Sequence, residues 1–366
     1  MTAPSPAVTI DARLIEASGI GTYLQNLLPR IIQSKAEWRF TLLGRPAELT
    51  ELACVGRHQV TVVPCDAPIY GIGEQLQLAR RVPRDTSLMW SPHYNIPLAY
   101  SGPLVVTVHD LCHLALPHIT PGAHRRAYAR GMFSLVKRRA RRVLCDSEFT
   151  STEFCRLAGR PREDPVVIHL GVDENWFNIP PAERPHPRPY LLYVGNVKPH
   201  KNLATLVSAF QTIASTIPHD LLIVGKQEGF ITPDSSVGVA ARELGPRVRF
   251  TGPVRRELLE QLFTHADIFV FPSLYEGFGL PPLEAMASGC PTIVSRAGSL
   301  PEVCGDAALY FNPDDSQQLA ATVTELLGNE EMRWCLQARG RTQAAKFSWD
   351  RCARRTTEVF EELLSE

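Results

Sequence analysis

Short runs of β-branched and other apolar residues alternate with helical segments along most of this 366-residue chain. Runs of this kind are typical of strands buried on both faces of a parallel sheet. They fall at residues 7–11, 39–44, 59–64, 87–91, 104–109, 142–146 and 166–170, and then at 190–195, 220–225, 247–251, 267–272, 291–295 and 308–311. Strands alternating with helices predict α/β architecture, here two doubly wound domains with a cleft between them.

A proline-rich stretch separates the two series of strands. Residues 178–189 contain five prolines in twelve positions, a composition that disfavours regular structure and suits a linker. We therefore expect one domain over residues 1–180 and a second over residues 181–348. A last helix, roughly Trp349 to Leu364, is expected within residues 349–366.

Composition narrows the classes of partner and compartment. The 38 basic and 38 acidic residues cancel, and no nucleic-acid-binding motif occurs, so no nucleic-acid partner is expected. The nine cysteines include no Cys-x-x-Cys pair, which favours a reduced compartment without structural zinc. The N-terminus lacks the features of a signal peptide, and no apolar stretch approaches the roughly 18 residues of a membrane span. A cytoplasmic protein is expected.

Two glutamates, Glu276 and Glu284, lie eight positions apart in the second half. They follow a buried strand and precede a helical segment that Gly289 ends. A strand, a glycine-rich turn and a helix in this order present backbone N–H groups that suit a phosphate. Glu276 would then meet a sugar, and Glu284 would reach a pair of hydroxyls such as those of a ribose. The alternative is that both are ordinary loop and helix carboxylates.

A glycine pair, Gly19 and Gly21, follows the first predicted strand and heads a helix. A Gly-x-Gly at a helix start lets a backbone come close to a phosphate. The third glycine of the dinucleotide-binding fingerprint is missing, so that motif is excluded. A plain turn is the other interpretation.

His109 ends a buried strand and is followed by Asp110. A histidine in this place is either a hydrogen-bonded structural residue or a group at the ligand-binding edge of the sheet. His113 and His118 follow in the same loop. Their spacing around Pro117 fits metal ligands poorly, so no metal site is expected.

Three potential cations follow the first strand of the second half, beside a glycine turn at Gly195. Lys198, His200 and Lys201 lie within four residues, a cluster suited to neutralising a diphosphate leaving group. The alternative is a solvated basic turn.

Residues 271–291 resemble a known family signature. Their sequence, Phe-Pro-Ser-Leu-Tyr-Glu-Gly-Phe-Gly-Leu-Pro-Pro-Leu-Glu-Ala-Met-Ala-Ser-Gly-Cys-Pro, resembles the Glu-x7-Glu motif of retaining glycosyltransferases of family 4. The resemblance extends over nearly the whole chain and implies the GT-B fold, two Rossmann-like domains facing a cleft. It implies an acceptor-side domain first, a nucleotide-sugar donor domain second, and a last helix that packs back on the first domain.

The resemblance implies a role for each matching residue. Glu276 would bind the donor sugar, Glu284 the ribose and Lys201 the diphosphate, while His109 would lie against the donor sugar. The implied catalytic residues are thus His109, Lys201 and Glu276. The implied donor-binding residues are Gly19, Gly21, Gly195, Asn196, Lys198, Gly277, Phe278, Gly279, Leu280 and Glu284. Many family members have an arginine where this chain has Asn196, which leaves Lys198 or His200 as the second cation.

The resemblance also implies a mechanism. The bond to the anomeric carbon would break through an oxocarbenium-like state while negative charge builds on the phosphate. Side-chain cations and backbone amides would stabilise that charge, so no metal or other cofactor is expected. No well-placed carboxylate nucleophile is evident. Front-face substitution is therefore implied, with the leaving phosphate helping to deprotonate the acceptor hydroxyl.

One segment is strongly basic. Residues 111–145 contain no Asp or Glu, and Lys and Arg gather from Arg125 to Arg142 among aromatic and apolar residues. Such a helix is typical of elements that bind an anionic membrane surface, and peripheral attachment to the inner face of the cytoplasmic membrane is one prediction. The other interpretation is a helix that packs its apolar side on the sheet and solvates its charges.

The segments Ile10-Asp-Ala-Arg and Lys198-Pro-His-Lys-Asn look most like those of bacterial mannosyltransferases of O-antigen and exopolysaccharide synthesis. This resemblance implies GDP-mannose as donor and a glycan or polyprenyl-diphosphate-linked acceptor in surface polysaccharide synthesis. Donors such as dTDP-rhamnose and UDP-hexoses stay open, because none of these residues reads the base. A UDP-sugar epimerase on a similar scaffold and a non-catalytic nucleotide-sugar-binding protein are the other interpretations.

Overall fold

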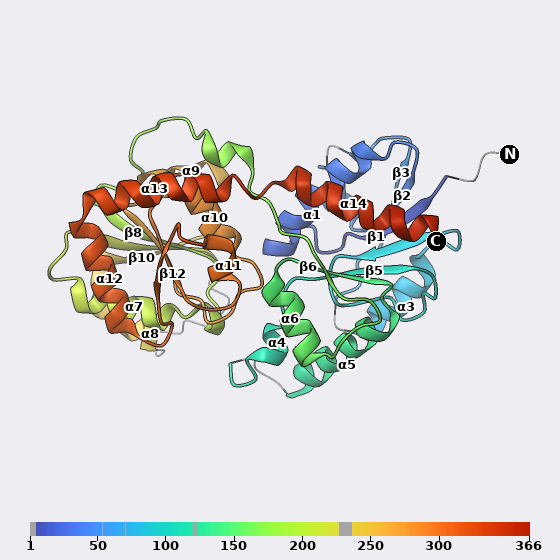
Figure 1. Cartoon of the computed structure of the whole chain (residues 1–366), viewed down its shortest axis with the longest axis horizontal. Helices are drawn as coiled ribbons and strands as arrows, with labels where there is room; N and C mark the ends of the chain where they lie inside the picture. The colour runs from blue at the N-terminus through green and yellow to red at the C-terminus, as the bar shows by residue number, and fades with distance from the viewer. Residues whose placement is uncertain (1–4, 53, 70, 120–122, 227–235) are drawn as a thin grey trace. The chain divides into compact units, whose positions relative to one another are not determined.

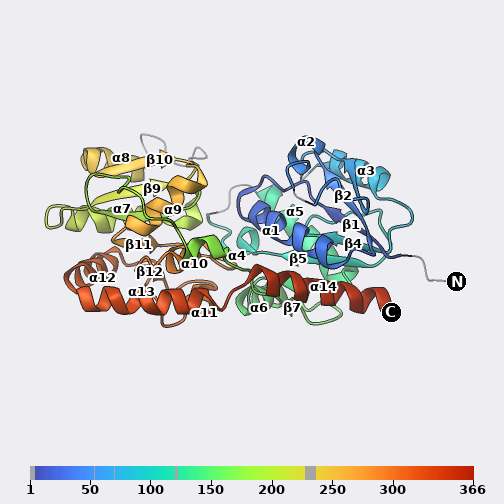
Figure 2. The same cartoon turned by 90° about the horizontal axis from the view of Figure 1, so that it is seen from above.

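The structure is a computed structural model that describes residues 5–52, 54–69, 71–119, 123–226 and 236–366. The chain forms two compact units, one of residues 1–171 with 349–366 and the other of residues 172–348. Each unit is built on one parallel sheet with helices packed against it (Figures 1 and 2). The expectation of two doubly wound α/β domains is confirmed.

The first unit contains a seven-stranded sheet in the order β3-β2-β1-β4-β5-β6-β7. Its strands are β1 (Ala7–Asp11), β2 (Arg39–Gly44), β3 (Val60–Pro64), β4 (Leu88–Ser91), β5 (Leu104–Val108), β6 (Arg142–Cys145) and β7 (Val166–Val167). Its helices are α1 (Ser18–Ser34), α2 (Pro46–Leu49), α3 (Ile72–Arg81), α4 (Cys112–Ala115), α5 (Ala123–Arg139), α6 (Glu148–Leu157) and α14 (Trp349–Ser365). The strand order reverses between β1 and β4, where open α/β sheets place their ligands.

The last helix, α14, belongs to the first unit although it follows the whole second unit in sequence. It lies along α1 (Figure 1), and it also packs against β4. Its Phe360 packs edge-on against Trp90 with ring centroids 5.4 Å apart. Aromatic contacts of this kind bury large apolar areas and fix the helix on the sheet.

The basic helix α5 turns its apolar residues inward. Met132, Phe133 and Val136 are buried in a core cluster with residues of β4, β5 and β6. Arg139 donates hydrogen bonds to the carbonyl groups of Leu98 and Tyr100. Phe133 of this segment therefore stabilises the fold, while Arg125, Arg130 and Arg138 face outward.

The second unit contains a six-stranded sheet in the order β10-β9-β8-β11-β12-β13. Its strands are β8 (Tyr190–Val194), β9 (Asp220–Val224), β10 (Val248–Gly252), β11 (Ile268–Phe271), β12 (Thr292–Ser295) and β13 (Leu309–Phe311). Its α-helices are α7 (Leu203–Ile213), α8 (Ser236–Glu243), α9 (Arg256–His265), α10 (Leu280–Ala287), α11 (Leu300–Cys304), α12 (Ser316–Gly328) and α13 (Glu330–Ala344). Its 3₁₀ turns are η1 (Glu174–Phe177), η2 (Pro199–Lys201) and η3 (Gly245–Arg247). The strand order reverses between β8 and β11.

The proline-rich segment 178–189 contains no helix or strand, but it lies within the second unit. His186 is buried there, with Nε2 2.7 Å from Oδ2 of Asp220, and Arg184 pairs with Asp267 at 3.1 Å. These pairs fasten the segment to the second unit. The first unit ends at residue 171, before the expected boundary at 180.

Candidate functional site

The turn after β8 forms the first part of the site. Gly195 has φ +153°, and its amide donates to the carbonyl of Val224 at 2.9 Å. Gly225, after β9, has φ +143°, and a Cβ there would lie 2.1 Å from the carbonyl oxygen of Gly195. The two strand ends therefore approach so closely that a side chain at 225 is excluded. Asn196 and Lys198 lie half-buried on this turn.

Asn202 fixes the end of the 3₁₀ turn η2, next to Lys201. It adopts a left-handed conformation with φ +56°. Its side-chain amide donates to the carbonyls of Pro272 at 3.1 Å and Pro313 at 2.8 Å. One residue thus fastens η2 to the segments that follow β11 and β13. Its short polar side chain also makes the left-handed backbone tolerable.

The turn after β11 forms the second part of the site and carries Glu276. The carbonyl of Glu276 accepts hydrogen bonds from the amide and the hydroxyl of Ser299, both at 3.1 Å. A Cβ at Gly298 would lie 2.5 Å from the same carbonyl oxygen. The side chain of Phe278 is buried against Phe347, with ring centroids 5.7 Å apart, so Phe278 offers a ligand only its backbone.

The backbone donors of this turn precede two prolines. Gly279 has φ +103° and caps α10, which begins at Leu280. Pro281 and Pro282 follow and have no N–H group. Backbone amides that could face a phosphate therefore come from residues 277–280, the same residues that the sequence predicts for donor binding.

Lys201 and Glu276 meet where these two turns come together. Lys201 Nζ lies 2.6 Å from Glu276 Oε1, and the side chains are 17% and 12% exposed. The backbone also joins the turns, because the amide of Leu274 donates to the carbonyl of His200 at 2.8 Å. The structure thus brings together a cation, a carboxylate and backbone amides at the switch point between β8 and β11. A leaving diphosphate needs such donors.

Glu284 lies on α10, and no hydrogen bond or ion pair from the described residues reaches its carboxylate. Burial raises its pKa to about 7, although the nearby Arg256 opposes the shift and Asp173 adds to it. A partly buried carboxylate without a partner has the properties of a group that awaits a hydrogen-bonding ligand.

The glycines predicted in the first half lie in the first turn of α1. A Cβ at Gly21 would lie 2.4 Å from the carbonyl oxygen of Ile15, so the preceding loop requires glycine there. At Gly19 a side chain would meet no atom within 4 Å. The fold therefore requires glycine at position 21. It does not require glycine at position 19, where the absence of a side chain leaves the start of α1 uncovered.

His109 follows β5, and its ring is hydrogen-bonded on both nitrogens. Nδ1 lies 2.6 Å from Asp146 Oδ2, and Nε2 lies 3.0 Å from the carbonyl oxygen of Pro92. Burial lowers the pKa of His109, but the charge of Asp146 and these hydrogen bonds outweigh burial, so the pKa is raised. Asp146 and Pro92 were not singled out in the sequence, because both come from strands distant along the chain.

Within the described part of the chain, no three His, Cys, Asp or Glu side chains converge as metal ligands would. No described helix combines the length and the apolar character needed to cross a membrane. All nine cysteines are free.

Two family profiles together match most of the chain. Residues 17–176 match the profile described as Glycosyltransferase Family 4, and residues 174–343 match that of Glycosyl transferases group 1. The chain is 32% identical over 268 residues to O-antigen chain mannosyltransferase B of Escherichia coli, covering 70% of this chain and 69% of that one. The chain belongs to glycosyltransferase family 4.

This glycosyltransferase has further relatives in sequence and in structure. It is 34% identical over 248 residues to the serotype-specific mannosyltransferase WbdA of Escherichia coli, covering 64% of this chain and 29% of that one. Sucrose-phosphate synthase of Thermosynechococcus elongatus superposes with a TM-score of 0.79 at 20% identity, covering 99% of both chains. Anabaena HepE in complex with UDP-glucose gives 0.77 at 18% identity, covering 97% of this chain and 99% of that one. These likenesses show the GT-B fold.

Proposed function

We propose that this glycosyltransferase moves mannose from GDP-mannose, with retention, to a glycan or polyprenyl-diphosphate-linked acceptor in surface polysaccharide synthesis. The observation that carries the proposal is the meeting of Lys201, Glu276 and the amides of residues 277–280 at the switch point of the second unit. The two Escherichia coli relatives, both described as mannosyltransferases, support mannose as the sugar.

The proposed donor site divides its work among these groups. Lys201 and the turn amides would hold the diphosphate and stabilise its charge as the sugar leaves. Glu276 would accept hydrogen bonds from sugar hydroxyls, and Glu284 from those of the ribose. Since Lys201 now pairs with Glu276, a bound donor would separate the two and give each a ligand group in exchange.

Retention is proposed to occur by front-face substitution. The acceptor oxygen would bond to the anomeric carbon on the face from which the diphosphate leaves, and the acceptor proton would pass to the leaving phosphate oxygen. Charge stabilisation by Lys201 and amides would make a bound metal or other cofactor unnecessary. The cytoplasm, where nucleotide sugars are made, would be the compartment.

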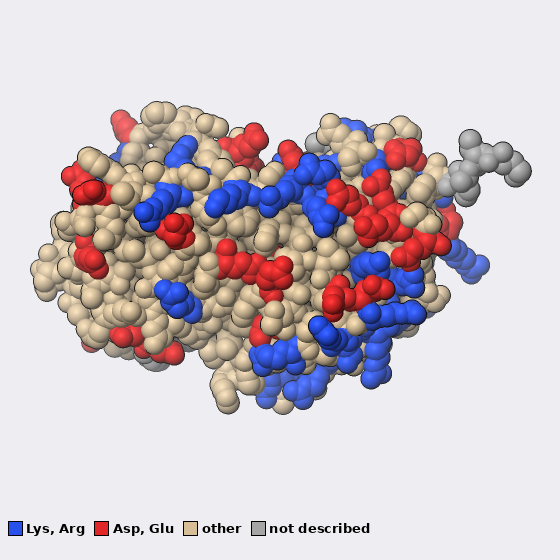
Figure 3. All heavy atoms as spheres, viewed as in Figure 1, with Lys and Arg blue, Asp and Glu red and all other residues tan. Residues whose placement is uncertain are grey.

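Attachment to an anionic membrane surface is proposed through charge alone. Arg125, Arg130, Arg138 and Arg141 of the basic segment are exposed, and Figure 3 shows Lys and Arg gathered over the part of the first unit that contains α5. Anionic lipid headgroups attract such residues by about 1 kcal/mol each. Because the apolar side of α5 is buried, no insertion of this helix into lipid is proposed.

A thermal-shift panel tests the donor. GDP-mannose, dTDP-rhamnose and UDP-glucose are each added at the same concentration, so that the ligand with the lowest Kd stabilises the folded protein most. A ligand at about a hundredfold its Kd stabilises the folded protein by ~2.7 kcal/mol. GDP-mannose is expected to raise the Tm most, and Lys201→Ala to reduce that shift. If UDP-glucose alone raised the Tm, GDP-mannose would be rejected as the donor. Release of free nucleotide and an altered sugar without acceptor would support the epimerase instead.

A further inference from the structure

Both ring nitrogens of His109 face hydrogen-bond acceptors. An ionised carboxylate and a carbonyl oxygen can only accept, so the 2.6 Å contact to Asp146 and the 3.0 Å contact to Pro92 each require an N–H on the ring. Neutral imidazole has one N–H, whereas imidazolium has two. Only the imidazolium satisfies both partners at once.

We propose that Asp146 and the Pro92 carbonyl hold His109 as an imidazolium, so that His109 is not the base of the reaction and Asp146 is its positioning residue. The charge state follows from the first unit alone. Its consequence for transfer rests on the proposed function and on the place of His109 against the donor sugar, which the family resemblance implies.

The start of α6 holds both the ring and the backbone of His109. Asp146 directly follows β6, and its side chain is only 4% exposed. Ser147 caps α6 by accepting from the amide of Thr150 at 3.0 Å. The Thr150 hydroxyl in turn donates to the carbonyl of His109 at 3.3 Å. A change at Asp146 therefore acts on a ring whose backbone is fixed separately.

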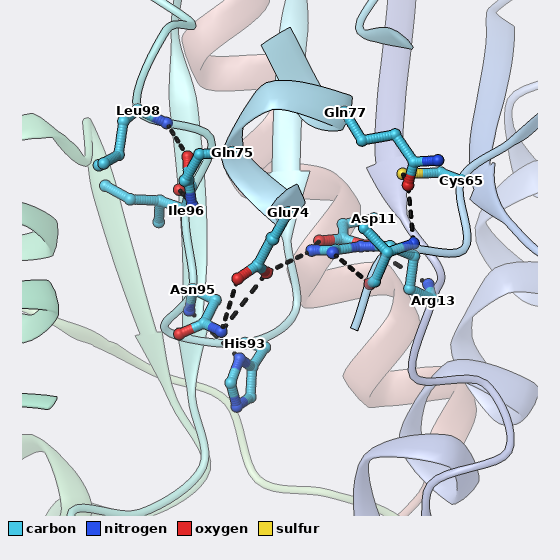
Figure 4. A network of polar contacts seen from close by, with 11 residues as sticks. Asp11, Arg13, Cys65, Glu74, Gln75, Gln77, His93, Asn95, Ile96 and Leu98 are labelled. Atoms are coloured by element: carbon cyan, nitrogen blue, oxygen red, sulfur yellow. Dashed lines mark hydrogen bonds and ion pairs between the residues drawn. The ribbon is translucent and has the colours of Figure 1, made fainter. Parts of the chain in front are cut away.

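A buried network fixes the loop that carries the Pro92 carbonyl (Figure 4). Asn95 Nδ2 lies 3.4 Å from the carboxylate of Glu74, and Glu74 pairs with Arg13 at 2.8 Å. Arg13 also pairs with Asp11 at 2.6 Å. The ion pairs join the loop after β1 to helix α3, and the hydrogen bond of Asn95 joins α3 to the loop after β4, which carries the Pro92 carbonyl.

The groups facing His109 come from several elements. Tyr23 of α1 meets the ring edge-on with centroids 4.9 Å apart, and Cys352 of α14 lies near Asp146. Asp110 is the next residue and adds to the raised pKa of His109. His93 follows β4, and burial together with the charge of His109 lowers the pKa of His93 to about 3. His93 is thus neutral, and Asp146 is the buried counter-charge of His109.

The pair has a defined role in the proposed reaction. An imidazolium with both N–H groups engaged has no lone pair to accept the acceptor's proton, which leaves that proton to the departing phosphate. Asp146 also balances the charge of His109, so the pair does not repel positive charge that develops on the sugar ring. His109 would therefore offer a rigid, neutral ion pair beside the donor.

The substitution Asp146→Asn removes the negative charge beside His109 but nearly keeps the shape of the side chain. The amide can still hydrogen-bond to Nδ1, but the neutral partner no longer favours imidazolium. In ¹⁵N-histidine-labelled protein, assigned with His109→Gln, wild-type His109 is expected to show two protonated nitrogens at pH 7.5, and the Asn variant one. The variant should lose about tenfold to a hundredfold in kcat/KM at pH 7.5, the range for a charged hydrogen bond. The ratio of its kcat/KM to that of the wild type at the same pH should recover as pH falls and His109 is protonated again.

Asp110→Asn is the control, and the NMR spectrum and the pH profile test separate parts of the proposal. Asp110→Asn removes a neighbouring charge that does not contact the ring, and its His109 should stay doubly protonated at pH 7.5. A neutral His109 in the wild-type spectrum would overturn the proposal even if the Asn variant failed to fold. If kcat/KM of Asp146→Asn depended on pH as it does in the wild type, the role of the His109–Asp146 pair in transfer would be overturned. Failure of the proposed function would abolish turnover but leave the wild-type spectrum as expected.

Discussion

Lys201 is the single side chain on which the donor site most depends. It supplies positive charge at a partly buried point, where charge acts more strongly than in water. Lys201→Ala should lower kcat/KM by about a hundredfold or more, as expected for loss of one strong electrostatic contact to the leaving group. Steady-state kinetics measures the change. Lys346→Ala removes an exposed lysine of the same unit and serves as the control. Near-normal turnover in Lys201→Ala would remove Lys201 from the mechanism.

Glu284 should make donor affinity depend on pH. Its pKa is about 7, and ribose hydroxyls donate to the ionised form, so binding favours ionisation. The Kd for GDP-mannose should therefore rise as pH falls below 7, by up to about tenfold per pH unit, and should level off above it. A nucleotide sugar has no phosphate that titrates in this range. Calorimetry from pH 5.5 to 8.5 checks this, and Glu284→Gln should give a flat profile. A sloping profile in that variant would assign the titration to another group.

The sequence could predict the charged residues of the site but not their supports. Glu276 and Lys201 belong to motifs with recognisable spacing from a strand end. Asn202, Ser299 and Asp146 act through backbone atoms or partners from other strands, with separations such as 111 residues between Asn202 and Pro313. Contacts of that range depend on the finished fold, so local patterns carry little trace of them.

The 3₁₀ turn η2 is held by Asn202 through its left-handed backbone and its side-chain hydrogen bonds. Two substitutions of Asn202 separate these two contributions to stability. Asn202→Gly keeps the left-handed backbone but loses the hydrogen bonds to Pro272 and Pro313. Asn202→Ala loses these hydrogen bonds and also disfavours the left-handed backbone. It should therefore be less stable than Asn202→Gly by about 1 kcal/mol. Denaturant unfolding measures stability. Both variants should also lower kcat/KM, because Lys201 is released. Equal stability of the two variants would contradict a role for the backbone conformation.

The central strands of both sheets were predictable because they are buried on both faces, which gives near-continuous apolar runs, as in β5 and β11. The proline-rich segment was predicted only in part. Its lack of helix and strand follows from its prolines, but its attachment to the second unit depends on His186 and on the buried Asp220, 34 residues further along. Local composition cannot indicate such a pair, so the linker interpretation placed the boundary too late.

For the chain as a whole, charge should control membrane binding. Replacing the exposed Arg125, Arg130 and Arg138 with Gln should weaken cosedimentation with vesicles that contain anionic lipid. The binding should also fall as salt rises, because charges are screened beyond about 8 Å at physiological ionic strength. Replacing Arg249, Arg255 and Arg339 of the second unit changes the net charge equally and is the control. Equal loss in both triple variants would assign the effect to net charge rather than to this segment.

The stereochemistry of transfer tests the central claim most directly. GDP-mannose labelled with ¹³C at the anomeric carbon is incubated in EDTA with an α-mannose-terminated trisaccharide, and the product is examined by NMR. We expect an α-linked product, one GDP per mannose transferred, and an unchanged rate without added metal. A β-linked product, or transfer that EDTA abolishes and magnesium or manganese restores, would contradict a retaining reaction driven by Lys201 and the turn amides.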